Sequence, residues 1–165
     1  MIEAGVHSVK QWEARTGVAG RSDCDQGRHA TAGLRIGYQD DFRWQINYGD
    51  AIGRYMGMNS FNVGALDANG EINLTAMYGA LAAYRHVWND NMRSTLGVSF
   101  SDADNDTALG GIDVPASFQS VHANVIWSPI ERMGLGAEYI WGRRKDESGS
   151  DGKLSRTQLS ATYLY

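Results

Sequence analysis

Apolar and polar residues alternate along most of this chain with a period of two. Between Ser155 and Tyr165, Leu159, Ala161 and Tyr163 share one parity, and Arg156 and Gln158 share the other. Successive side chains of a β-strand point to opposite faces, so this run predicts a strand with one apolar face. The same pattern recurs upstream and predicts antiparallel strands near residues 29–39, 42–50, 72–88, 91–103, 117–128, 132–145 and 153–165. The Ala and Leu content of the third run would also suit a helix.

Aromatic residues stand near the ends of these apolar faces. The outward set includes Trp44, Tyr84, Val98, Val125, Tyr139 and Tyr163. Strands of about ten residues with alternating character and aromatic girdles are typical of transmembrane β-barrels. No stretch approaches the roughly 18 apolar residues that a membrane-spanning helix needs. The pattern therefore predicts an all-β fold, an antiparallel meander of a porin-like transmembrane barrel.

The links between the predicted strands alternate in length. Short links lie at 40–41, 89–91 and 129–131, and long links rich in Gly, Asp, Asn and Ser lie at 50–71, 102–116 and 145–152. Outer-membrane barrels have short periplasmic turns and long extracellular loops. Tyr165 is therefore expected at the periplasmic end. A weaker candidate strand, Ala4–Glu13, would make about eight strands.

Length and composition fit one membrane domain. The 165 residues include 20 Gly and 2 Pro and show no linker that would divide them, so residues 1–165 are expected to form a partial barrel domain. Its clear strands cover 28–165, whereas 1–27 is a weakly assigned strand and loop. The formal net charge of -4 argues against nucleic acid as a partner. Cys24 is alone, which excludes an internal disulfide.

The beginning of the chain is unusual for an exported barrel. Met1–Gly5 lacks the basic segment and apolar core of an export signal, so we expect the sequence to be incomplete at its N-terminus. An open half-barrel would leave unpaired backbone groups in hydrocarbon, each costing several kcal/mol. Either further strands complete the barrel or these strands close on themselves. We favour the first.

Four segments, taken in order, resemble the DcaP-like porins. They are Asn47–Tyr55, Ala83–Asp90, Ser120–Asn124 and Gly136–Arg144. The resemblance runs from about Arg28 to Tyr165 and covers the C-terminal half of such a porin. It implies a trimeric outer-membrane channel of Gram-negative bacteria, with a barrel of about sixteen strands around an aqueous pore. Dicarboxylates are the solute class it implies.

If the aromatic faces meet lipid, the other parity lines a pore. An arginine-rich wall attracts anions, and two guanidinium groups could hold a dicarboxylate. Alternatively, these arginines pair with acids and stiffen the wall. Glu138 is the one acid we expect on this parity within the strands. The predicted pore-lining residues are Arg35, Arg43, Gln45, Asn47, Arg85, Arg93, His122, Asn124, Glu138, Arg144, Arg156 and Gln158.

Other chemistry is weakly indicated. Asp102, Asp104 and Asp106 resemble the start of a calcium loop, but Thr107 stands where that loop needs Gly, so we expect a solvated loop and no metal. No catalytic arrangement stands out, and neither an enzyme nor a cofactor is predicted. The sequence thus predicts a passive channel for small anions. One alternative is a small closed barrel acting as an adhesin or structural protein without a pore. The other is a soluble β-sandwich, which would not need aromatics at two levels.

Overall fold

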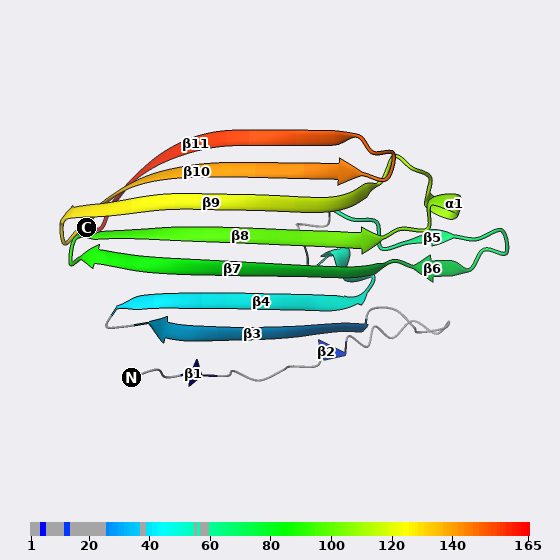
Figure 1. Cartoon of the computed structure of the whole chain (residues 1–165), viewed down its shortest axis with the longest axis horizontal. Coiled ribbons are helices and arrows are strands. Elements are labelled where there is room, and N and C mark those ends of the chain that lie inside the picture. The colour runs from blue at the N-terminus through cyan, green and yellow to red at the C-terminus, as the bar shows by residue number, and fades with distance from the viewer. Residues whose placement is uncertain (1–3, 6–11, 14–25, 37–38, 55, 57–59) are drawn as a thin grey trace.

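One antiparallel sheet forms most of the molecule (Figure 1). The computed structural model describes residues 4–5, 12–13, 26–36, 39–54, 56 and 60–165. The main strands, in spatial order, are β3 (Gln26–Ile36), β4 (Asp40–Asp50), β7 (Ala76–Asn89), β8 (Met92–Asp104), β9 (Pro115–Ile130), β10 (Met133–Asp146) and β11 (Asp151–Tyr163). The predicted antiparallel meander is confirmed. Within the described residues, no helix has the length and apolar character needed to cross a membrane.

The two edges of the sheet differ. The short strands β1 (Ala4–Gly5) and β2 (Trp12–Glu13) both pair antiparallel with β3. They are the two ends of the predicted strand Ala4–Glu13, whose middle lies outside the described residues, as does Cys24. At the other edge, β11 pairs with β10 and with no other described strand. The sheet is thus open over the described part of the chain, and no second sheet covers it as in a sandwich.

Most of the predicted strand boundaries are shifted by one to four residues. Asp40 and Asp41, expected in a link, are the first residues of β4. The predicted strand 72–88 is divided, because β6 (Ile72–Leu74) pairs with β5 (Gly64–Leu66) in a separate hairpin. Thr75 separates the two parts: its N–H donates to the Val63 carbonyl and its carbonyl accepts from the Ala51 N–H, at 3.0 and 2.9 Å. β7 starts directly afterwards and is a strand throughout, not a helix.

The long links lie together at one end of the sheet (Figure 1). The first contains the 3-10 helix η1 (Ile52–Arg54) and the β5–β6 hairpin, and the second contains α1 (Thr107–Gly110). In the hairpin turn, the Asp67 carboxylate accepts the N–H groups of Glu71 and Asn69, both at 2.8 Å. These bonds, with that from Glu71 the stronger cause, hold the pKa of Asp67 below its usual value. Asp106 caps α1 by accepting from the N–H groups of Ala108 and Leu109.

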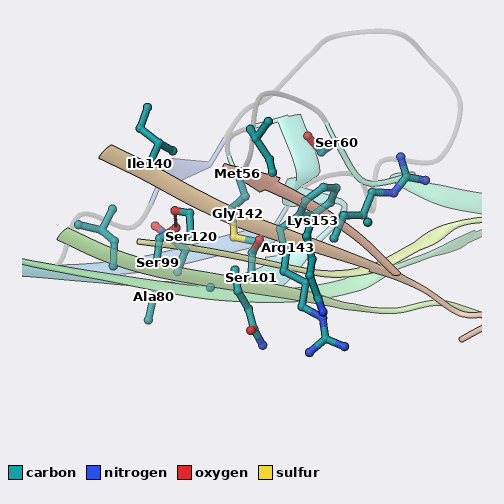
Figure 2. A pocket seen from close by; sticks show the side chains of 18 of the residues that line it. Met56, Ser60, Ala80, Ser99, Ser101, Ser120, Ile140, Gly142, Arg143 and Lys153 are labelled. Carbon is teal, nitrogen blue, oxygen red and sulfur yellow. Dashed lines mark hydrogen bonds between the residues drawn. The ribbon is translucent and has the colours of Figure 1, made fainter. Parts of the chain in front are cut away.

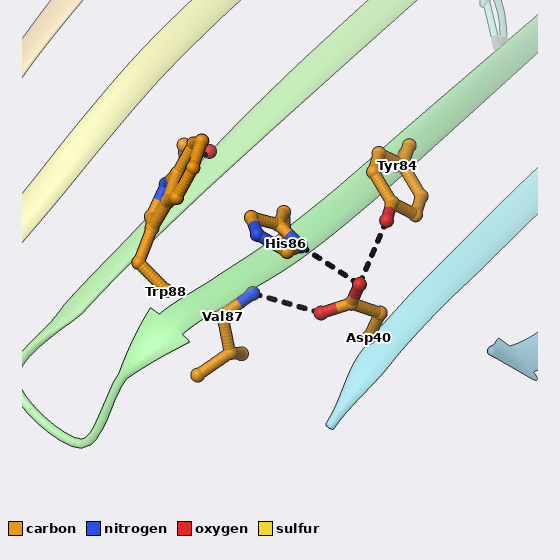
Figure 3. Close-up of polar contacts among 6 residues, drawn as sticks. Asp40, Tyr84, His86, Val87 and Trp88 are labelled. Atoms are coloured by element: carbon orange, nitrogen blue, oxygen red, sulfur yellow. Dashed lines mark hydrogen bonds and ion pairs between the residues drawn. The ribbon is translucent and has the colours of Figure 1, made fainter. Parts of the chain in front are cut away.

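A polar network joins two strands at the short-turn end (Figure 3). The Asp40 carboxylate accepts from the Tyr84 hydroxyl at 2.7 Å and from the Val87 N–H at 2.9 Å, and it lies 2.8 Å from His86 Nδ1. The His86 ring in turn meets Trp88 edge to face, with ring centroids 4.4 Å apart. One carboxylate thus fastens the beginning of β4 to the end of β7.

Replacing Asp40 by Ala is expected to lower the thermal stability of the folded protein. The change removes the carboxylate that accepts from the Tyr84 hydroxyl and the Val87 N–H and that contacts the His86 imidazole. Asp40→Asn keeps one carbonyl oxygen as an acceptor and should lower the stability less. Melting followed by circular dichroism in detergent, with Asp90→Ala in the neighbouring β7–β8 turn as the control, measures the difference. Equal melting temperatures for Asp40→Ala and the control would contradict a fastening role.

Candidate functional site

One face of the sheet carries a hollow of about 770 Å³ (Figure 2). Its lining includes Gln45 of β4, Leu81 of β7, Ser99 of β8 and Ser120 of β9, and it continues to Leu154 of β11. These residues lie opposite one another in the strand register and therefore share one face. We call this the inner face and the opposite one the outer face.

The strand register places all twelve predicted pore-lining residues on the inner face. One row of paired residues crosses the seven main strands in the order Arg35, Asp41, Arg85, Thr95, Asn124, Glu138 and Gln158. The next row holds Arg43, His122 and Arg156, the third holds Gln45, and the fourth holds Asn47 and Arg144. Arg93 lies one row nearer the short turns, opposite Val87. The residues form a broad wall, not one compact cluster.

Asp41 is a wall residue that the sequence analysis missed. Its carboxylate lies 3.0 Å from Arg43 Nε and also forms an ion pair with Arg85. The Asp41 side chain is 17% exposed, whereas that of Arg43 is 71% exposed. The expectation that Glu138 is the one strand carboxylate of this parity is therefore wrong, because the strand begins earlier than its apolar pattern suggests. Two of the predicted arginines, Arg43 and Arg85, thus share this one carboxylate.

A second hollow, of about 370 Å³, lies near the short turns. Three arginines from three strands line it, Arg35, Arg85 and Arg93, together with Asn89 and Asp90. Arg35 and Arg93 form no ion pair with the described residues, and the same holds for Arg156 farther along the wall. Unpaired guanidinium groups that share a hollow raise the local concentration of anions.

Neutral polar pairs occupy the wall of the larger hollow. The Gln45 amide donates to Asn47 Oδ1 at 2.8 Å, and the hydroxyls of Ser99 and Ser120 are 2.7 Å apart. Figure 2 shows these two serines side by side, with a dashed line between their hydroxyls. These groups can exchange hydrogen bonds with a passing hydrated solute, as the wall of an aqueous pore does.

Charged pairs flank this neutral stretch. His122 Nδ1 lies 3.6 Å from Glu138 Oε1, and Arg144 Nε lies 2.7 Å from Asp146 Oδ1. Both pairs remain partly exposed, with side-chain exposures of 43% and 30% for the first. Arg144 is thus compensated at the long-loop end, so the arginines that have no ionic partner among the described residues lie nearer the short turns.

The outer face carries the predicted lipid-facing side chains. Val98 lies opposite Ala82 and Val121, and it is 46% exposed. The register puts Trp44, Tyr84, Val125, Tyr139 and Tyr163 on the same face. Large apolar side chains standing exposed along a whole sheet face need an apolar environment.

An apolar patch on the inner face was not predicted. Met77, Ala103 and Phe118 have the inner parity, but Met77 and Ala103 are buried beneath Ile52 and Phe61 of the first long link. Large apolar residues at the polar parity, Met77 and Phe118, were the available signal, and both stand at the long-loop ends of their strands.

Comparisons with known proteins agree with this geometry. A model of the DcaP outer membrane protein family matches residues 31–165. The fold is similar to the crystal structure of the outer membrane channel DcaP of Acinetobacter baumannii, with a TM-score of 0.74 and 22% sequence identity. The match covers 84% of this chain and 41% of that channel, so this chain spans less than half of its length. Among curated proteins, none matches this sequence. Neither match is to an enzyme.

Proposed function

This chain belongs to the DcaP outer membrane protein family, and we propose that its inner face forms part of the wall of a passive channel for small anions. Family membership places it in the outer membrane of Gram-negative bacteria. The chain supplies an open sheet that matches 41% of the DcaP channel, so in this proposal further strands complete the barrel. Lipid then covers the outer face, and water fills the space on the inner face.

The charge of the inner face is the observation that carries the proposal. Its strands carry three carboxylates of this parity, Asp41, Glu138 and Asp146, against the six arginines Arg35, Arg43, Arg85, Arg93, Arg144 and Arg156. The whole chain has a formal net charge of -4, so the positive charge is a property of this face and not of the composition. A positive wall in a narrow low-dielectric channel favours anions over cations.

Dicarboxylates are the solutes that this wall would suit. Arg35 of β3, Arg85 of β7 and Arg93 of β8 line one hollow of about 370 Å³. Guanidinium groups bind carboxylates through paired hydrogen bonds, and two separate groups can hold the two ends of one solute. Retention must stay weak for the solute to leave, and the partial exposure of these side chains suits that.

The complete protein, purified in detergent and inserted in planar bilayers, tests the proposal. We expect open channels whose reversal potential in a KCl gradient indicates preference for chloride at low salt. Addition of succinate should reduce the chloride current more than addition of an uncharged solute of similar size. A cation-selective channel would refute the proposal, and a folded protein without conductance would favour the closed adhesin-like barrel.

The complete protein is also expected to be a homotrimer, which light scattering in detergent measures.

A further inference from the structure

The outer face becomes basic at the long-loop ends of β10 and β11 (Figure 1). Arg143 and Lys153 lie directly opposite each other there, and Lys145 follows two residues later on β10. All three have the parity of Tyr139, which belongs to the outer face. We call Arg143, Lys145 and Lys153 the basic cluster.

One carboxylate compensates the basic cluster in part. Asp151 Oδ2 lies 3.1 Å from Arg143 Nε and 3.9 Å from Lys153 Nζ. Both basic residues border the 770 Å³ hollow as well, but Asp151, which lies opposite Lys145, draws their charged ends to the outer face. The side chains of Arg143 and Lys153 are still 40% and 65% exposed, so each can contact a further group. The cluster therefore holds three positive charges against one negative charge.

Acidic residues confine this positive charge to two strands. Asp102 and Asp104 of β8 line a hollow of about 500 Å³ together with Lys145. β9 separates β8 from β10, a distance of roughly 10 Å at the usual strand spacing. Arg143 and Lys153 do not line this acidic hollow, so they are the part of the cluster best placed to bind an anion.

Aromatic and hydroxyl groups border the cluster towards the middle of the strands. Trp141 lies opposite Ser155, whose hydroxyl is 2.9 Å from the Tyr139 hydroxyl. Tryptophan and tyrosine are typical of the level at which a membrane meets water. Their ring faces and these hydroxyls can also pack on and hydrogen-bond to sugar rings. The basic residues thus stand just beyond an aromatic level on the lipid-facing side of the sheet.

We propose that Arg143 and Lys153 bind the phosphate groups of a phosphorylated glycolipid in the outer leaflet of the membrane. The long loops of outer-membrane barrels are extracellular, so this end of the outer face meets that leaflet, which in Gram-negative bacteria consists largely of lipopolysaccharide. A guanidinium group binds phosphate through paired hydrogen bonds, and an ammonium group binds it as a point charge. The inference rests on the part of the proposed function that places lipid against the outer face, and it does not need a conducting pore.

Native mass spectrometry of the complete protein in detergent tests the proposal, with lipid A that carries two phosphate groups as the probe. The double variant Arg143→Gln, Lys153→Gln should bind this lipid about tenfold more weakly than the wild type, because it loses two positive charges. Asp151→Asn should bind it more tightly, because both cations are then free for phosphate. Arg144→Gln is the matched control. This arginine is the next residue along β10, but it lies on the inner face with Asp146, so its loss should leave lipid binding unchanged.

The outcomes separate this inference from its alternatives. If the double variant binds lipid A like the wild type, or if Asp151→Asn does not bind it more tightly, the proposal is wrong. Equal binding of phosphatidylglycerol would overturn it in favour of a surface for any anionic lipid. A change of oligomeric state in the double variant, measured by light scattering, would instead make the cluster a contact between copies of the chain. If the double variant does not fold, Lys153→Gln decides in the same assay. The planar-bilayer currents test the channel proposal independently of lipid binding.

Discussion

Replacing Val98 by Arg should destabilise the folded protein by about 2 to 4 kcal/mol, the cost of an arginine facing lipid near the bilayer midplane. Val98 stands in the middle of β8, on the outer face, between Ala82 and Val121. A guanidinium group at this position has no acidic partner on either neighbouring strand and must reach towards the headgroups. Chemical denaturation of the complete protein in lipid vesicles measures the free energy of unfolding.

The adjacent residue provides the control for this prediction. Ser99→Arg introduces the same side chain one position along β8, but on the inner face towards the 770 Å³ hollow. It removes the hydroxyl contact with Ser120, which is worth about 1 kcal/mol, and leaves the new charge in water. Similar losses at the two positions would show that the faces have been assigned wrongly.

The strands were predictable because each has one apolar face along nearly its whole length. A period of two remains recognisable even where single residues depart from it. The alternately short and long links then fix the direction of each strand. The strand ends were less predictable. Asp40 is a strong turn former by type, yet it belongs to β4, because its carboxylate accepts hydrogen bonds from β7, 44 or more residues away in the sequence.

The link between β4 and β5 packs on the sheet in a way that the alternating pattern does not predict. Met77 and Phe118 break the alternation, because they place apolar side chains on the otherwise polar inner face. From the sequence alone, such residues look like isolated exceptions to the pattern. Met77 is buried, and Phe118 partly buried, by residues from a link that has no periodic pattern of its own. Contacts between an irregular loop and a sheet depend on where the chain turns, here at Ala51, and that turn uses a conformation unusual for alanine.

The charged wall was predictable in membership but not in pairing. Parity alone puts the six predicted arginines on one face, because it needs only the position of each residue within its strand. Whether an arginine is free depends on its cross-strand neighbours, and so on the register. Arg43 and Arg85 share Asp41, whereas Arg35, Arg93 and Arg156 form no ion pair with the described residues.

The arginines that have no ionic partner among the described residues are expected to control the selectivity. In the complete protein, changing Arg35, Arg93 and Arg156 together to Gln should reduce the permeability ratio of chloride to potassium, because it removes the positive charges without a described ionic partner. Changing Arg43 alone to Gln should have a smaller effect, since Asp41 then keeps Arg85 as its partner. Reversal potentials in planar bilayers under a KCl gradient measure both.

Asp41→Asn should move the selectivity in the opposite direction. It removes the carboxylate that compensates Arg43 and Arg85, so the wall gains positive charge and the preference for chloride should increase. The difference between Asp41→Asn and the triple arginine variant should be large at 0.1 M salt, where the Debye length is about 10 Å, and should shrink at 1 M, where it is about 3 Å. If both variants keep the wild-type reversal potential at low salt, the charge of this wall does not control permeation. A selectivity that instead follows the wall charge in both directions would establish that the sheet lines the conducting path.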